Sequence, residues 1–206
     1  MLEEFKAGEA IVMKKNPNFF IEGRPKLDEI IVNIIKDPSA LLIAMENGDA
    51  DIYPFMAGSQ EIKRLEKVDA LEITSEGYAA VGPINWLAFN TASEKLSDVR
   101  VRQAVAHAVN VPAILQTIMR GNAAEVSQLV SPAMRGYSDA LAARPAYDPA
   151  AAKALLAEAG YEDGFSFGLK CPNDRYLNDE AVCQAVTGML AQVGITATLD
   201  AMPVQN

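Results

Sequence analysis

Apolar and polar positions follow two different periods along the first part of the chain. Continuous or alternating apolar runs predict short β-strands, and apolar residues three or four positions apart predict amphipathic helices between them. The run Ile30–Ile35 is rich in β-branched residues, which predicts a strand buried on both faces. The predicted strands are Glu9–Lys15, Ile30–Ile35, Ala50–Tyr53 and Ala70–Thr74, and the predicted helices are Asp37–Gly48 and Gly58–Val68.

In the second part of the chain, capping residues mark the helix ends. Asp98 and the pair Asp148-Pro149 are typical of helix starts, and Gly160 suits a left-handed C-cap. The predicted helices are Val99–Val109, Pro112–Gly121, Ala150–Ala159 and Asp179–Gln192, and the predicted strands are Trp86–Phe89, Phe165–Lys170 and Ile195–Leu199. This alternation predicts an α/β (or α+β) fold with mixed sheets flanked by helices.

Composition narrows the classes of protein to which the chain can belong. Of its 206 residues, 50% are hydrophobic and 22% charged, the profile of a globular protein with a substantial core. The formal net charge of -9 argues against nucleic acid as a partner, because phosphate binding needs concentrated lysine and arginine. No stretch is long and apolar enough to predict a membrane-spanning helix.

The two cysteines, Cys171 and Cys183, are predicted at the end of a strand and inside a helix. Their spacing is not that of a zinc site, which needs clustered pairs or added histidines. We therefore expect no metal and no cofactor, and two buried free thiols that behave as small hydrophobic side chains. A disulfide bond in an oxidising compartment is the alternative, because the geometry that it requires cannot be read from sequence.

Signs of catalysis are weak. His107 is the only histidine, it lies inside a predicted helix, and no serine or cysteine near it has the context of a nucleophile. Phosphate-binding glycine loops and the Gly-x-Ser-x-Gly elbow are absent from the sequence. Acid pairs such as Asp49/Asp51 and Glu162/Asp163 flank turns and are best interpreted as solvated. We therefore expect a protein that is not an enzyme.

Asp98, Arg100 and Arg102 are the most distinctive group of charged residues. The two arginines are two positions apart and so cannot share one helix face. We expect them to brace the start of the helix by pairing with a carboxylate. The alternative is that an arginine clamps the carboxylate of a ligand in bidentate fashion.

Two blocks of sequence, Trp86–Leu115 and Tyr147–Phe165, together resemble a known family. The residues that carry the resemblance are Phe89-Asn90, Asp98-Val99-Arg100-Val101-Arg102-Gln103-Ala104, Lys153-Ala154-Leu155-Leu156 and Ala159-Gly160-Tyr161. In this order and spacing they resemble the extracytoplasmic solute-binding proteins of ABC importers, in the peptide/dipeptide/nickel-binding family.

The resemblance implies a fragment of a two-lobe periplasmic binding protein. Members of the family are longer chains, and Met1-Leu2-Glu3-Glu4 lacks the basic and apolar regions of a signal peptide, so we expect an internal fragment. We place a boundary near Gly82-Pro83. Residues 1–82 would belong to the lobe that carries the termini of the full protein, and residues 83–206 would begin the second large lobe without completing it.

The resemblance also implies a function and a place for the ligand. The protein would capture a small solute, most simply a di- or oligopeptide, between its lobes and deliver it to a permease in the inner membrane. A nickel chelate, glutathione or a sugar as the solute, or a receptor or interaction module without a transport role, are the alternatives.

Segments that border the cleft in the family correspond to two places in this sequence. The candidate residues there are Tyr53, Phe55, Met56, Asn85 and Trp86. Aromatic side chains supply contact area and an asparagine supplies both donor and acceptor, although plain core packing is an equal alternative. We interpret the segment Arg175–Asp179 as structural, with Asn178 or Asp179 capping the following helix.

Overall fold

The computed structural model describes residues 1–54, 59–74, 84–130, 132 and 134–204. The chain forms two compact units. Unit 1 comprises residues 1–56 and 64–71, and unit 2 comprises residues 57–63 and 72–206. The boundary predicted at Gly82-Pro83 lies outside the described residues, so the division at that point stays a prediction.

Unit 1 contains a three-stranded antiparallel sheet with the order β1-β2-β3. The strands are β1 (Leu2–Lys6), β2 (Ala10–Lys14) and β3 (Glu29–Asn33). Ala10 of the central strand pairs with Lys6 on one side and with Asn33 on the other. The second and third strands follow the predicted apolar runs, whereas β1 was not predicted.

The predicted burial of the third strand on both faces is wrong for the described chain. Ile30, Ile31 and Val32 are 46%, 55% and 40% exposed. Because successive side chains of a strand point to opposite faces, both faces of β3 are exposed. An apolar run shows that a strand can pack against apolar layers on both faces. The described residues do not cover either face of β3 with such a layer.

One helix and the end of a second complete unit 1. The first, α1 (Pro38–Asn47), begins as predicted, because the Asp37 carboxylate accepts a hydrogen bond from the Ala40 amide, and it ends at Gly48 with φ 75°. The second, α2 (Ser59–Leu65), has residues 64–65 in unit 1 and residues 59–63 in unit 2. A small core of Leu42, Met45 and Leu65 joins them.

Three predicted strands are not strands in the structure. The segments Ala50–Tyr53, Ala70–Thr74 and Trp86–Phe89 have no regular secondary structure. A strand exists only through pairing with a neighbouring strand, so an apolar run predicts the capacity for pairing and not the pairing itself.

The stretch of unit 2 before β4 is mainly helical. Its elements are α4 (Glu94–Ser97), α5 (Val99–Ala108), α6 (Val111–Thr117), the 3₁₀-helix η1 (Asp139–Leu141) and α7 (Pro149–Glu158). Asp98, Asn110 and Asp148 each accept a backbone amide hydrogen bond at the start of α5, α6 and α7. The predicted helix starts at Asp98 and Asp148-Pro149 are therefore confirmed.

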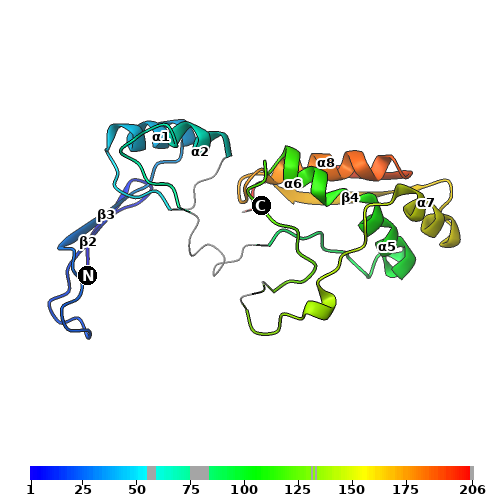
Figure 1. The fold of residues 1–206 in the computed structure, drawn as a ribbon, viewed down its shortest axis with the longest axis horizontal. Coiled ribbons are helices and arrows are strands. Elements are labelled where there is room, and N and C mark those ends of the chain that lie inside the picture. The colour runs from blue at the N-terminus through cyan, green and yellow to red at the C-terminus, as the bar shows by residue number, and fades with distance from the viewer. Residues whose placement is uncertain (55–58, 75–83, 131, 133, 205–206) are drawn as a thin grey trace. The chain divides into compact units, whose positions relative to one another are not determined.

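The rest of unit 2 is a β-α-β unit made by β4 (Phe165–Pro172), α8 (Asp179–Ala191) and β5 (Ile195–Met202). The two strands are parallel and pair in register from Phe165 with Ile195 to Pro172 with Met202. Burial alternates along β4, so one face of this small sheet packs inward and the other is exposed. Figure 1 shows α8 running alongside the sheet.

One apolar core holds unit 2 together. Val101 of α5, Leu156 of α7, Leu190 of α8 and Ile195 of β5 are each at most 1% exposed and belong to the same cluster. Helices α5 and α7 pack on each other, and α8 packs on both strands. The expected α/β class is confirmed. The loop between β4 and α8 connects two elements that both contribute to this core.

Candidate functional site

The loop between β4 and α8, residues 173–178, occupies the position in unit 2 that most favours ligand contact. It follows the carboxyl end of β4, which lies beside the carboxyl end of the parallel strand β5. In open α/β sheets, ligands bind in the crevice outside the carboxyl ends of the strands. Side chains carried by this loop are therefore candidates for ligand recognition.

Asp179, the first residue of α8, organises the backbone of the loop. Its Oδ2 accepts hydrogen bonds from the amides of Arg175 (3.1 Å) and Tyr176 (3.0 Å), and its Oδ1 accepts one from the amide of Glu180 (2.9 Å). A carboxylate at a helix start also interacts favourably with the helix dipole. Asp179 thus has a structural role, as predicted, and it also holds the loop, whereas Asn178, at the N-cap position of α8, makes no side-chain capping hydrogen bond.

Further hydrogen bonds hold the two ends of the same loop. Asn178 adopts a left-handed conformation with φ 54°, and its side-chain amide donates to the carbonyl oxygen of Ile118 at 3.2 Å. On the other side, the Asn173 amide donates to the carbonyl of Met202, which continues the pairing of β4 with β5 by one residue. The loop backbone is thus anchored to three other parts of unit 2.

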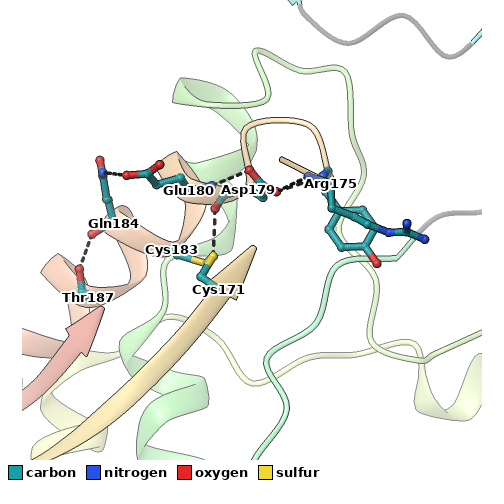
Figure 2. The surroundings of a disulfide bond; sticks show 8 residues. Cys171, Arg175, Asp179, Glu180, Cys183, Gln184 and Thr187 are labelled. Atoms are coloured by element: carbon teal, nitrogen blue, oxygen red, sulfur yellow. Dashed lines mark hydrogen bonds between the residues drawn. A yellow bond between two sulfur atoms is a disulfide. The ribbon is translucent and has the colours of Figure 1, made fainter. Parts of the chain in front are cut away.

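The side chains of Arg175 and Tyr176 extend from this anchored backbone. The Arg175 guanidinium carbon lies 5.7 Å from the centre of the Tyr176 ring, within the range of a cation–π contact, and Tyr176 is 51% exposed. Figure 2 shows the Arg175 side chain pointing away from α8. Within the described part of the chain, no carboxylate forms an ion pair with Arg175.

An arginine without an acidic partner has five N–H donors available for a bidentate carboxylate. The sequence-based interpretation missed this pair, because it judged the segment by its capping residues. The available signal was positional: an arginine and a tyrosine lie in the loop between a predicted strand, Phe165–Lys170, and the predicted helix that leads to a second strand.

The residues predicted to line a cleft fall in different units. Tyr53 belongs to unit 1 and packs, half-buried, against the core of α1 and α2. Phe55 and Met56 lie outside the described residues. In unit 2, Asn85 is exposed and Trp86 is 66% exposed, so Trp86 is not core in the described chain. The role of all five residues in ligand binding stays a prediction.

Arg100 pairs with a carboxylate, as expected, whereas Arg102 bonds to backbone carbonyls. The Asp98 carboxylate accepts from the backbone amide, Nε and Nη2 of Arg100, and Arg100 Nη1 donates to the carbonyl of Glu158 at the end of α7. Because the Arg100 side chain donates to it, the pKa of Asp98 lies below its usual value. Arg102 Nη1 donates to the carbonyls of Leu96 and Ser97.

The single histidine also has a structural contact. His107 Nδ1 lies 2.8 Å from the carbonyl oxygen of Ala146, so this nitrogen carries the proton and ties α5 to the segment before α7. In the residues that the structure covers, no group of three or more histidine, cysteine or acidic side chains could hold a metal ion.

The expectation of two free thiols is wrong. Cys171 and Cys183 form a disulfide bond, with their Cα atoms 6.5 Å apart. The cause is the β-α-β geometry: the end of β4 and the second turn of α8 pack against each other, which brings the two side chains to bonding distance. The alternative left open by the sequence is the one that the structure adopts.

A hollow of about 490 Å³ lies elsewhere on unit 2. Its lining comes from residues 109, 111, 112, 125 and 142–147, so it does not include the loop between β4 and α8. The two charged side chains that line it, Glu125 and Arg144, pair with each other at 3.3 Å. It offers a ligand no unpaired charge from these residues.

Comparison with known proteins decides the family. The whole chain, residues 1–206, matches the family described as bacterial extracellular solute-binding proteins, family 5, middle part. The chain belongs to this family. No helix among the described residues is long and apolar enough to cross a membrane.

Relatives in family 5 differ in what their names say they bind. The dipeptide-binding protein of Escherichia coli K12 is 31% identical over 85% of this chain and 32% of its own length. Heme-binding protein A of Haemophilus influenzae is 32% identical over 79% of this chain and 28% of its own length. This chain therefore spans about a third of the length of the curated relatives that it matches.

Solved structures carry the same fold. The binding protein AgaA of A. tumefaciens R10, in complex with agropinic acid, superposes with a TM-score of 0.74 at 29% identity, over 98% of this chain and 40% of AgaA. The expected fold, part of a periplasmic binding protein, is confirmed.

Proposed function

We propose that the whole protein is the solute-binding component of an ABC importer. The observation that carries this proposal is the family 5 match over residues 1–206. In this proposal the protein works outside the cytoplasmic membrane, in the periplasm, and passes its solute to a permease in the inner membrane. It binds and releases the solute without making or breaking a bond.

We infer that the solute carries a free carboxylate and is most simply a di- or oligopeptide. The related proteins are named for a dipeptide and for heme, and one solved relative holds agropinic acid; each of these ligands bears a carboxylate. Arg175 is the matching group here, since its guanidinium is on an anchored loop at the end of β4 and has no acidic partner among the described residues.

The proposed site lies between two lobes, of which residues 1–82 and 83–206 would form parts. Tyr53, Phe55, Met56, Asn85 and Trp86 would add apolar contact area and an amide, which suit a ligand recognised through its backbone. Closure of the lobes requires a ligand that contacts both of them, because only differential binding can shift the equilibrium toward the closed form.

A titration of the complete gene product tests this proposal. Isothermal calorimetry would compare a defined dipeptide mixture, glutathione and heme, and the same dipeptides as C-terminal amides. We expect binding of at least one acid, and binding of its amide weakened about tenfold, the effect of losing one charge-assisted hydrogen bond pair. Equal binding of acid and amide would contradict the role of Arg175.

An importer component and a receptor module differ in their partner. Deletion of the host's candidate ABC permease genes should abolish uptake of the bound solute if the proposal is right. Unimpaired uptake after deletion of every candidate permease, together with solute binding, would favour the receptor module instead.

A further inference from the structure

The disulfide bond closes the segment that carries Arg175. Cys171 is the next-to-last residue of β4 and is 3% exposed, and Cys183 lies in the second turn of α8. Twelve positions separate the two cysteines, and the whole loop between β4 and α8 lies inside the ring that they close. The bond therefore fixes the start of α8 against the end of β4.

A short chain of contacts runs from the disulfide bond to Arg175. Cys171 Sγ lies 3.5 Å from the carbonyl oxygen of Asp179. The carboxylate of the same Asp179 accepts hydrogen bonds from the backbone amides of Arg175 and Tyr176. Figure 2 shows the disulfide, Asp179 and Arg175 in this order along the end of the sheet. Asp179 thus touches the disulfide with its backbone and holds the loop with its side chain.

The other hydrogen bonds of the loop do not hold the backbone amides of Arg175 and Tyr176. The bonds from Asn173 to Met202 and from Asn178 to Ile118 fix the two ends of the loop, and the side chain of Asp174 accepts a hydrogen bond from the Val204 amide at 3.1 Å. Among the described residues, the backbone amides of Arg175 and Tyr176 donate hydrogen bonds only to Asp179, which is the first residue of α8. A helix terminus frays readily when nothing ties it down. The cross-link joins the second turn of α8, four residues after Asp179, to the end of β4.

We propose that the Cys171–Cys183 disulfide is a positioning element for the ligand site: through Asp179 it holds Arg175 where its guanidinium meets the carboxylate of the solute. This inference rests on the proposed function, because it needs Arg175 to contact the ligand. It adds a dependence of solute selectivity on the oxidation state of the protein, which no feature of the family match implies.

The ratio of acid to amide affinity, and not the stability of the protein, distinguishes a disulfide that positions Arg175 from one that only stabilises the fold. Loss of a disulfide destabilises most proteins whether or not it positions a site. A disulfide that only stabilises would weaken the binding of acids and amides to the same extent. A disulfide that positions Arg175 would weaken the binding of acids more than that of amides, because only the acid has a partner for the guanidinium.

The experiment uses the complete gene product and two probes, an equimolar dipeptide mixture and the same mixture as C-terminal amides. Competition calorimetry well below the unfolding temperature gives the ratio of acid to amide affinity. The variants are Arg175→Gln, Cys171→Ser/Cys183→Ser, and Cys171→Ala/Cys183→Ala in case the buried serine hydroxyl prevents folding. Dithiothreitol treatment of the unmodified protein is a second route: the reagent closes to its cyclic disulfide, and the protein's Sγ–Sγ bond becomes two thiols.

We expect a ratio of about ten for the oxidised protein, close to one for Arg175→Gln, and at least threefold below the oxidised value for the disulfide-free and the reduced protein. A collapse of the ratio in Arg175→Gln with an unchanged ratio in every disulfide-free form would overturn the positioning role and leave the proposed function standing. A ratio of one in the oxidised protein would overturn both.

Discussion

The close approach of Gly164 and Gly194 gives the sharpest stability prediction. Gly164 precedes β4 with φ 78°, a left-handed conformation, and its neighbour Phe165 donates a hydrogen bond to the carbonyl of Gly194 at 3.2 Å. A Cβ atom placed on Gly164 would lie 2.0 Å from that same carbonyl oxygen and 2.9 Å from its carbon. The substitution Gly164→Ala therefore meets both a backbone penalty and a clash with backbone atoms that cannot rotate away.

Two effects determine how much free energy of unfolding Gly164→Ala should remove: the backbone conformation and the steric overlap. An L-residue in the left-handed region costs roughly 1–2 kcal/mol. Relieving the overlap requires β4 and β5 to separate at their first rung, which adds roughly 1–3 kcal/mol of packing strain, and weakens a backbone hydrogen bond worth about 1 kcal/mol. We expect Gly164→Ala to lower the free energy of unfolding by about 3 kcal/mol or more.

Gly168→Ala is the matched control, because it makes the same chemical change in the same strand. Nothing lies within 4 Å of a Cβ atom built there, and the residue is on the exposed face of β4. A glycine inside a strand carries an entropic penalty, so this variant should be neutral or more stable by about 0.5–1 kcal/mol. Urea unfolding followed by circular dichroism measures both. Equal losses at the two positions, or no loss at Gly164, would refute the reasoning.

Four further predictions concern the core, a helix cap, the disulfide and pH. Leu190→Ala, at a side chain that is 0% exposed, should lower the free energy of unfolding by about 2–5 kcal/mol in urea unfolding, whereas Leu129→Ala, at 67% exposed, should change it by less than about 0.5 kcal/mol. Asp148→Ala removes the N-cap of α7 and should cost about 1 kcal/mol of thermal stability, with Asp148→Asn nearly unchanged. Reducing the disulfide bond should lower the free energy of unfolding by about 3 kcal/mol, which is the chain entropy that a closed ring of this size removes from the unfolded state. An unchanged free energy of unfolding in reductant would contradict this prediction. The Arg100 side chain lowers the pKa of Asp98 in the folded protein below its usual 3.8. This pair should therefore stabilise the protein above pH 3.8 and lose its effect as the pH falls through the lower pKa of the folded state. The difference in unfolding free energy between the unmodified protein and Asp98→Asn should shrink in acid, and a difference that does not change with pH would exclude the pairing.

Local signals made the helices predictable. Asp37, Asp98 and Asp148 cap helices in the structure as expected, because a cap depends on a few neighbouring residues. The parallel strands β4 and β5 were also placed correctly, although each is longer than predicted. The helices α5 and α7 and the strands β4 and β5 share the apolar core of unit 2, so local preference and tertiary packing agree there.

Strands and pairings that depend on distant residues were less predictable. The apolar run Trp86–Phe89 has the composition of a strand but is not one in the described chain, because a strand needs a partner that composition cannot supply. The disulfide depends on how β4 and α8 pack, which the spacing of its cysteines does not reveal. Arg175 was overlooked because its importance comes from its position at the end of a parallel strand.

Native mass spectrometry of the complete gene product, purified gently from its host, shows whether the protein carries a solute with a carboxylate. We expect a protein heavier than its denatured form by the mass of a bound solute, and the released solute should fragment as a short peptide or another small molecule with a carboxylate. An empty protein that also shows no thermal shift with the dipeptide mixture, glutathione or heme would overturn the solute-binding function.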